Sequence, residues 1–290
     1  MEYLIHILIM LSIYFVLTSS AHLLIGMTNL ITLSHAAFFG IGSYVTALVT
    51  SALGMSLLMS LITVFICNGL IAFVFSIPTI KLKDDYFVLV TLGFQSIVYA
   101  MIYNWENLTQ GAQGYSGISG GKLLGLIEIV DTRLFLVISI LISVFIGYLM
   151  YRMINSPFGR VLKSMREDDI LLISQGKNPI KYKRWALVLS AAFCGVAGYE
   201  FATYTTYINP SSFNLNESIF ILSAVLIGGI GNVKGSVLGA ILIVVLPELF
   251  RFIPILSEYA APLREISYAF MLLLVLYFMP KGLAGNFTLK

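Results

Sequence analysis

The chain has 290 residues, of which 59% are hydrophobic and only 11% are charged, and its mean hydropathy is +0.94. A soluble domain needs far more charged residues to cover its surface, so this composition excludes a soluble enzyme or binding module. The formal net charge of +3 is small, and its basic residues follow a membrane pattern instead of indicating a nucleic-acid partner.

Apolar segments dominate the chain from end to end. Runs of about 18 residues or more can cross the ~30 Å hydrocarbon core as helices. The runs are residues 3–24, 36–53, 57–80, 87–103, 134–153, 185–207, 218–230, 236–252 and 266–279. The run 218–230 is short and favours a broken or re-entrant helix. We therefore expect an all-α, polytopic transmembrane helical bundle with eight to ten membrane segments, forming a single transmembrane domain over residues 1–290.

The distribution of basic residues predicts the orientation. Residues 152–184 contain eight of the chain's 17 Lys and Arg, and such segments face the cytoplasm. Alternation of the spans then places the loop 105–131 outside. The N-terminus also lies outside, unless a re-entrant segment near residues 24–34 reverses it. Residues 1–24 carry no basic residue and make an unconvincing signal peptide.

Polar residues and glycines inside apolar runs are costly in hydrocarbon and usually face a bundle or a cavity. The candidates for lining a path through the bundle are Ser34, His35, Gln95, Asn104, Glu200, Gly228 and Gly229. For His35 the favoured interpretation is a structural hydrogen bond between helices, and Glu200 could instead reach the interface by snorkelling. Cys67 and Cys194 read as small buried hydrophobes, and we expect neither a metal site nor a catalytic residue.

The glycine-rich stretch 228–236 reads GGIGNVKGS. It lacks the GK[ST] ending that a P-loop needs to hold phosphates, so no ATP site is expected there. Gly231, Gly235 and Gly239 are four residues apart, a spacing that allows close helix packing in a bilayer. A break at 228–231 could also expose backbone groups to a solute.

The charged segment 155–184 has its own helix signals. Ser156 can cap a helix that Pro157 begins, an apolar stripe follows at helical spacing, and Gly176 is a plausible stop. Asn178-Pro179 can start a second short helix. One interpretation is an ordinary loop helix on lipid, and the other is a docking surface for a soluble partner. The residues expected to dock are Phe158, Arg160, Leu162, Lys163, Met165, Arg166, Glu167 and Asp168, with Phe158, Leu162 and Met165 as apolar anchors.

Residues 156–169 read SPFGRVLKSMREDD, and this motif resembles the cytoplasmic segment of LivM-type permeases of branched-chain amino acid ABC importers. Further motifs are similar to blocks of that family in the same order, from about residue 26 to 285. They are LSHAAFFGIGSY (33–44), DYFVLVTLGF (85–94), LTQGAQGYSGI (108–118), NPSSF (209–213), GGIG (228–231), LPE (246–248) and PKGL (280–283). Gln95 stands where the family commonly has an acidic residue, and Gln113 where it has asparagine.

The resemblance implies a transport partnership in a bacterial cytoplasmic membrane. Such permeases pair with a second permease, two cytoplasmic ATPase subunits and an external solute-binding protein. ATP and Mg²⁺ would be held by the partner ATPases, with no cofactor in this chain, and residues 156–176 would form the coupling helix. The cargo would be a branched-chain or related small amino acid. The alternatives are a permease for another small solute such as urea, or a stand-alone secondary transporter.

Overall fold

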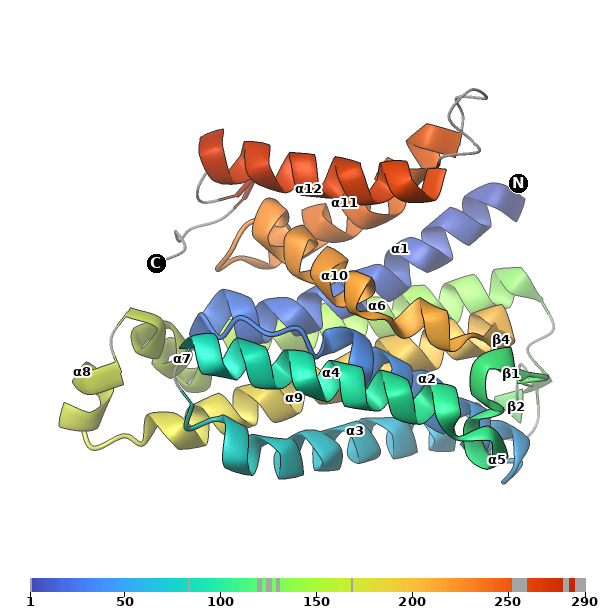
Figure 1. Cartoon of the computed structure of the whole chain (residues 1–290), viewed down its shortest axis with the longest axis horizontal. Helices are drawn as coiled ribbons and strands as arrows, with labels where there is room; N and C mark the ends of the chain where they lie inside the picture. The colour runs from blue at the N-terminus through green and yellow to red at the C-terminus, as the bar shows by residue number, and fades with distance from the viewer. Residues whose placement is uncertain are drawn as a thin grey trace.

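The chain folds as a bundle of long helices lying roughly side by side in the computed structural model (Figure 1), which describes residues 2–82, 84–118, 122–123, 127–128, 131–167, 169–251, 260–278 and 282–284. The helices are α1 (Glu2–Ala21), the π-helical turn η1 (His22–Gly26), α2 (His35–Ser51), α3 (Leu57–Thr79), α4 (Asp84–Asn104), α5 (Glu106–Thr109), η2 (Gly111–Gln113), α6 (Thr132–Asn155), α7 (Pro157–Glu167), α8 (Asp169–Ser174), α9 (Pro179–Thr205), η3 (Pro210–Phe213), α10 (Leu215–Gly228), α11 (Val233–Arg251) and α12 (Ala260–Phe278).

Every apolar run predicted from the sequence contains a helix, which confirms the all-α membrane bundle. Within the described part of the chain, five helices are long and apolar enough to cross a bilayer in one piece. They are α1 with η1, α3, α4, α6 and α9. The short run at 218–230 becomes α10, which has only 14 residues.

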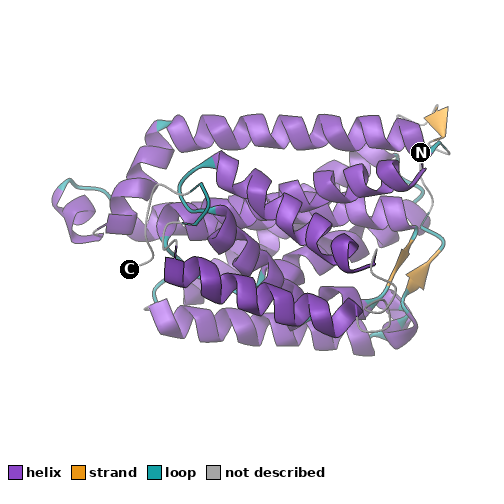
Figure 2. Cartoon of the chain, turned by 90° about the horizontal axis from the view of Figure 1, so that it is seen from above, coloured by secondary structure: helices purple, strands orange, loops and turns teal. Residues whose placement is uncertain are grey.

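The two ends of the bundle differ in character. At one end, α7 and α8 extend beyond the other helices (Figure 1), and at the opposite end lie α5 and the short strands. Strand β1 (Tyr115–Ser116) pairs antiparallel with β4 (Tyr207–Ile208), while β2 (Lys122–Leu123) pairs with β3 (Ile127–Glu128). The N-terminus lies at the strand end and α7 at the other, as Figure 2 also shows. This arrangement agrees with the predicted orientation, in which the loop 105–131 and the N-terminus share one side.

Helix α9 forms the centre of the bundle and is buried along almost its whole length against α1, α2 and α3. Its approach to α2 is close because both helices carry glycine there. A Cβ atom on Gly198 would lie 2.3 Å from the carbonyl oxygen of Phe39, and one on Gly42 would lie 2.5 Å from that of Gly195. The hydroxyl of Ser43 uses this closeness to donate a 3.0 Å hydrogen bond to the oxygen of Gly198.

The predicted coupling segment consists of two helices and not the single helix expected over residues 156–176. Helix α7 begins at Pro157 as predicted, and the amide of Gly159 donates to the hydroxyl of Ser156. Helix α7 ends at Glu167 and α8 begins at Asp169, and Asp168 between them lies outside the described residues. Gly176, with φ of +73°, follows the end of α8.

The second short helix expected from Asn178-Pro179 is instead the beginning of α9. The side chain of Asn178 accepts a 3.0 Å hydrogen bond from the amide of Ile180, and the helix then continues without a break for 27 residues. A capping residue indicates where a helix starts, but not how far it continues.

Candidate functional site

The first apolar region of the chain folds back on itself inside the bundle. The hydroxyl of Ser190 on α9 donates a 2.6 Å hydrogen bond to the oxygen of Ser20, near the end of α1. The same hydroxyl lies 3.2 Å from Nε2 of His35, the first residue of α2. The thiol of Cys194 also donates to the oxygen of His35. Residues 20 and 35 therefore lie at the same height along the bundle axis, and the segment between them runs away from that height and turns back to it.

The turn within residues 20–35 faces the coupling segment. The guanidinium of Arg166 on α7 donates a hydrogen bond to the oxygen of Gly26, the last residue of η1. Ser190 lies about 16 Å along α9 from Pro179, at 1.5 Å per residue. That is roughly half the thickness of the hydrocarbon core. Helix α2 consequently starts near the middle of the membrane. The re-entrant segment that the sequence suggested near residues 24–34 is therefore present, but the N-terminus remains at the end of the bundle opposite α7.

Short polar side chains surround the start of α2. The amide of Ala36 donates a 3.0 Å hydrogen bond to the hydroxyl of Ser218 on α10, and the amide of Leu33 donates a 3.1 Å hydrogen bond to that of Thr91 on α4. The hydroxyl of Ser34 lies 2.8 Å from that of Thr32. These contacts satisfy backbone groups that the irregular segment leaves unpaired in hydrocarbon.

Gln95 lies one helical turn beyond Thr91 and holds a second irregular segment. Its Nε2 donates a 2.7 Å hydrogen bond to the oxygen of Phe213, the last residue of η3. Its Oε1 and the Nδ1 of His35 are buried and have no hydrogen-bond partner among the described residues. The break between η1 and α2 is therefore lined by polar groups from α2, α4, α9 and α10. Three buried polar atoms are left over there among the described residues, the third being Oδ1 of Asn29.

Ser34, His35 and Gln95 are the predicted pathway residues that meet at this break. Asn104 lies apart, exposed at the end of α4, with its Nδ2 donating to the oxygen of Ala100. Glu200 also lies apart, although it is fully buried and so does not snorkel to the interface. It sits beside Ser139 of α6, yet neither carboxylate oxygen has a hydrogen-bond partner among the described residues.

The glycines between α10 and α11 form a tight turn. Cβ atoms on Gly228 and Gly235 would lie 2.1 and 2.0 Å from the oxygens of Gly235 and Gly229, respectively. A Cβ on Gly239 would lie 2.6 Å from the oxygen of Ala224. These glycines, including the pathway candidates Gly228 and Gly229, thus lie where two backbones approach closely.

Gly231 has a different role from Gly235 and Gly239, with which it was grouped by spacing. It has φ of +95° and belongs to the turn, and its amide donates a 3.0 Å hydrogen bond to Nε2 of His22. Because His22 is in η1, this bond joins the α10–α11 turn to the same π-helical turn that Arg166 contacts.

The apolar stripe of α7 faces the chain's own core. Leu162 and Met165 are 0% and 4% exposed, so their side chains are not available on the surface of the described chain. Phe158 is half-buried, with its ring centroid 5.9 Å from that of Tyr182. The predicted docking residues that α7 leaves exposed or half-exposed are Phe158, Arg160, Lys163 and Glu167. Asp168 lies outside the described residues.

Arg166 is buried although it was predicted from its charge to face a partner. Burial lowers the pKa of its guanidinium from the ordinary value, while the neighbouring Glu167 opposes this shift. A buried arginine bonded to a backbone carbonyl links two elements mechanically. Arg166 therefore connects α7 to the break at the start of α2, whatever α7 contacts on its outer side.

Several members of the break carry no signal in the sequence. Thr32, Thr91, Ser190 and Ser218 are single small polar residues in apolar surroundings, where serine and threonine commonly bond to their own helix. Only the packing of α2, α4, α9 and α10 around one point distinguishes them.

Comparison with known proteins finds one protein family that matches nearly the whole chain. Residues 3–279 match the family described as branched-chain amino acid transport system, permease component. The chain is 30% identical to the high-affinity branched-chain amino acid transport system permease protein LivM of Salmonella typhimurium, over 94% of this chain and 68% of that protein. It is likewise 30% identical to LivM of Escherichia coli, over 93% of this chain and 67% of that protein.

A second group of relatives is more distant. The permease protein LivH of Salmonella typhimurium is 23% identical over 90% of this chain and 87% of that protein. No solved structure matches the chain.

Proposed function

The chain belongs to the family of branched-chain amino acid transport permeases, and on this premise we propose that it carries leucine, isoleucine, valine or a related hydrophobic amino acid into the cytoplasm. It does so as the multi-pass membrane subunit of an ATP-driven importer in a bacterial cytoplasmic membrane. The observation that carries the proposal is the family match over residues 3–279, together with relatives whose names specify this transport system.

The proposed partners follow from the same family. Salmonella typhimurium and Escherichia coli each have a LivM and a LivH permease related to this chain. Because the identity is higher to LivM, we place this chain in the LivM position, opposite a LivH-like second permease. Two ATPase subunits that hold ATP and Mg²⁺, and an external solute-binding protein, complete the proposed importer.

The proposed coupling runs from α7 to the break before α2. The ATPases contact the outer surface of α7, where Arg160 and Glu167 are exposed. Movement of α7 is then transmitted by Arg166 to the oxygen of Gly26, and so to η1 and the start of α2. A helix that starts in mid-membrane can shift its first turn without moving its outer end, which is a means of opening and closing a path.

Reconstitution tests this proposal. The chain is co-expressed with a LivH-like permease and both ATPases, inserted into vesicles, and supplied with solute-binding protein. We expect uptake of labelled leucine that needs ATP and is competed by isoleucine and valine. Uptake of urea under the same conditions would instead assign another solute.

A stand-alone secondary transporter is the remaining alternative. The buried carboxyl of Glu200, which has no hydrogen-bond partner among the described residues, is the one observation that favours ion coupling. Leucine uptake by the chain alone, driven by an ion gradient without ATP, would establish that alternative and refute the importer.

A further inference from the structure

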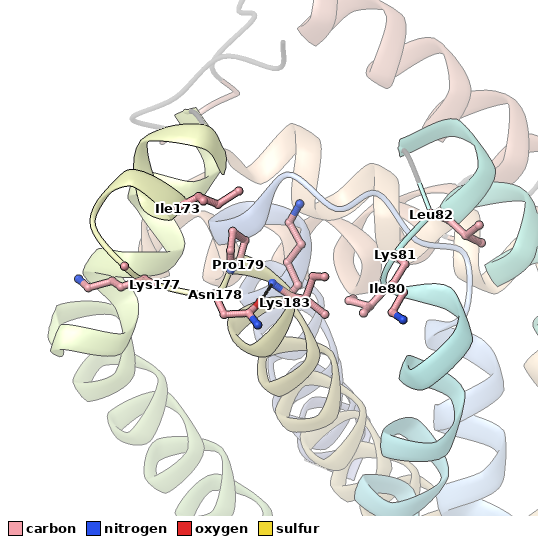
Figure 3. A pocket seen from close by; sticks show the side chains of 10 residues that line it. Ile80, Lys81, Leu82, Ile173, Lys177, Asn178, Pro179 and Lys183 are labelled. Atoms are coloured by element: carbon pink, nitrogen blue, oxygen red, sulfur yellow. Dashed lines mark hydrogen bonds between the residues drawn. The ribbon is translucent and has the colours of Figure 1, made fainter.

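A groove opens at the cytoplasmic end of the bundle, apart from the break described above. It has a volume of about 850 Å³, within the roughly 300–1,000 Å³ typical of small-molecule sites. Figure 3 shows residues 80–82 at the end of α3 on one side and the α8–α9 turn, with Ile173 and Asn178, on the other. Lys183, in the first turns of α9, lies between the two sides.

The polar part of the groove is basic. Lys81, Lys177 and Lys183 line it, and no Asp or Glu occurs among the described residues that line it. Lys177 stands at the rim with its side chain directed away from Lys81 (Figure 3), and Lys81 and Lys183 both line the groove. A concave site with this charge selects an anionic group.

The apolar part of the groove remains open to its surroundings. Leu82, Ile173 and Ile180 are 38%, 61% and 37% exposed, although all three are large hydrophobic residues. A free anion would leave these side chains uncovered. An occupant that combines an anionic group with hydrocarbon would satisfy both parts of the groove.

The groove also lies at the level of a bilayer surface. Deeper along the same two helices, the ring of Trp185 on α9 packs 6.5 Å from that of Phe73 on α3, and the guanidinium of Arg184 covers Phe73 at 5.6 Å. Phe73 and Trp185 each lie six residues from the end of their helix, within about two turns of Thr79 and Pro179. Ile80 lies about 10 Å beyond Phe73 toward the cytoplasm, at 1.5 Å per residue.

The wall of the groove continues into a lipid-facing surface. Val74 and Ile77 on α3 are 65% and 49% exposed on a helix that is long and apolar enough to span the membrane. Acyl chains lying on this surface would place their headgroup at the groove. This continuity favours lipid over a soluble protein as the occupant.

From these observations we propose that the groove between the end of α3 and the α8–α9 turn binds an anionic phospholipid of the inner leaflet. The phosphate lies between Lys81 and Lys183, and the upper part of the acyl chains covers Leu82, Ile173 and Ile180. This site is independent of the cargo and of the proposed transport cycle. Basic pockets at the cytoplasmic ends of membrane helices are known to bind such headgroups.

Tryptophan fluorescence gives a direct test, because the chain has only two tryptophans. With Trp105→Phe, Trp185 is the sole reporter and lies beside the groove. The full chain is reconstituted in vesicles that contain phosphatidylglycerol and phosphatidylcholine, with bromine on the acyl chains of one lipid or the other. We expect brominated phosphatidylglycerol to quench Trp185 more strongly than an equal fraction of brominated phosphatidylcholine.

Substitutions identify the site within the chain. Lys81→Gln and Lys183→Gln should each lower the preference for phosphatidylglycerol about fivefold, the equivalent of the interaction of one lysine with an anionic surface. Lys81→Arg keeps the charge and should keep the preference. Lys181→Gln is the matched control, since this exposed lysine belongs to the same segment but does not line the groove.

Four results would overturn the proposal. Equal quenching by both lipids would mean that no anionic lipid is selected. An equal loss of the preference for phosphatidylglycerol in Lys81→Gln and Lys181→Gln would assign the preference to general surface charge. Removal of the preference by excess inorganic phosphate would assign the groove to a free anion. Loss of ATPase co-purification in the lysine variants, without any change in quenching, would assign the groove to a protein contact.

Discussion

Arg166→Gln is the sharpest test of how α7 is joined to the membrane interior. The substitution removes the guanidinium that donates to the oxygen of Gly26, while glutamine keeps a polar side chain of shorter reach. A hydrogen bond from a charged group contributes about 1.5–3 kcal/mol. Loss of that coupling would lower ATP-dependent uptake about 10- to 150-fold, because each 1.4 kcal/mol corresponds to a factor of about ten.

The assay measures two quantities on the reconstituted importer, uptake of labelled leucine and hydrolysis of ATP. We expect Arg166→Gln to retain the ATPases through purification and to hydrolyse ATP, but with little uptake. Arg160→Gln is the matched control, because Arg160 carries the same charge on the exposed side of α7. Its expected effect is weaker recovery of the ATPases.

Normal uptake by Arg166→Gln would refute this reasoning, since the contact with Gly26 would then carry no coupling. Loss of the ATPases from Arg166→Gln, with full recovery from Arg160→Gln, would also refute it. That result would mean that the buried arginine, and not the exposed surface of α7, governs partner binding.

Three further predictions concern the bundle itself, and each is measured by thermal unfolding of the detergent-solubilised chain. Gly198→Ala should lower the free energy of unfolding by about 1–3 kcal/mol, because the added Cβ would lie 2.3 Å from the Phe39 oxygen. Gly69→Ala is the control and should leave the free energy of unfolding unchanged, because its added Cβ makes only ordinary contacts at 3.8 Å. His35→Ala and Ser190→Ala should each destabilise the chain, and the double variant should cost less than their sum, since the two side chains share one contact; additive effects would contradict that contact. Glu200→Gln should raise the unfolding temperature, because it replaces a buried carboxyl without a hydrogen-bond partner among the described residues by a neutral group of the same shape; a lower temperature would reveal a specific partner for the carboxylate.

Local sequence determined the class of the protein and most of its helices. Hydropathy is summed over neighbours in the chain, so the apolar runs identified the membrane helices without knowledge of their contacts. Capping is equally local, and Ser156 and Asn178 mark helix starts as their side chains predict. The ordered motifs from residue 33 to 283 were sufficient by themselves to indicate the permease family.

Tertiary structure alone decided where the break lies and which residues surround it. Residues 3–24 and 36–53 read as two ordinary spans, because hydropathy does not distinguish a segment that crosses from one that turns back. Ser190 fixes the turn by contacting Ser20 and His35, which are more than 150 positions away along the chain.

The same limit applies to α7. Its apolar stripe predicted a buried face but not whether a partner or the chain itself buries it, since an amphipathic pattern carries no information about the surface opposite. Leu162 and Met165 pack into the chain's own core, and Arg166 reaches Gly26, because α6 and α9 hold α7 against the end of the bundle. The direction in which a side chain points is thus a property of the assembled helices.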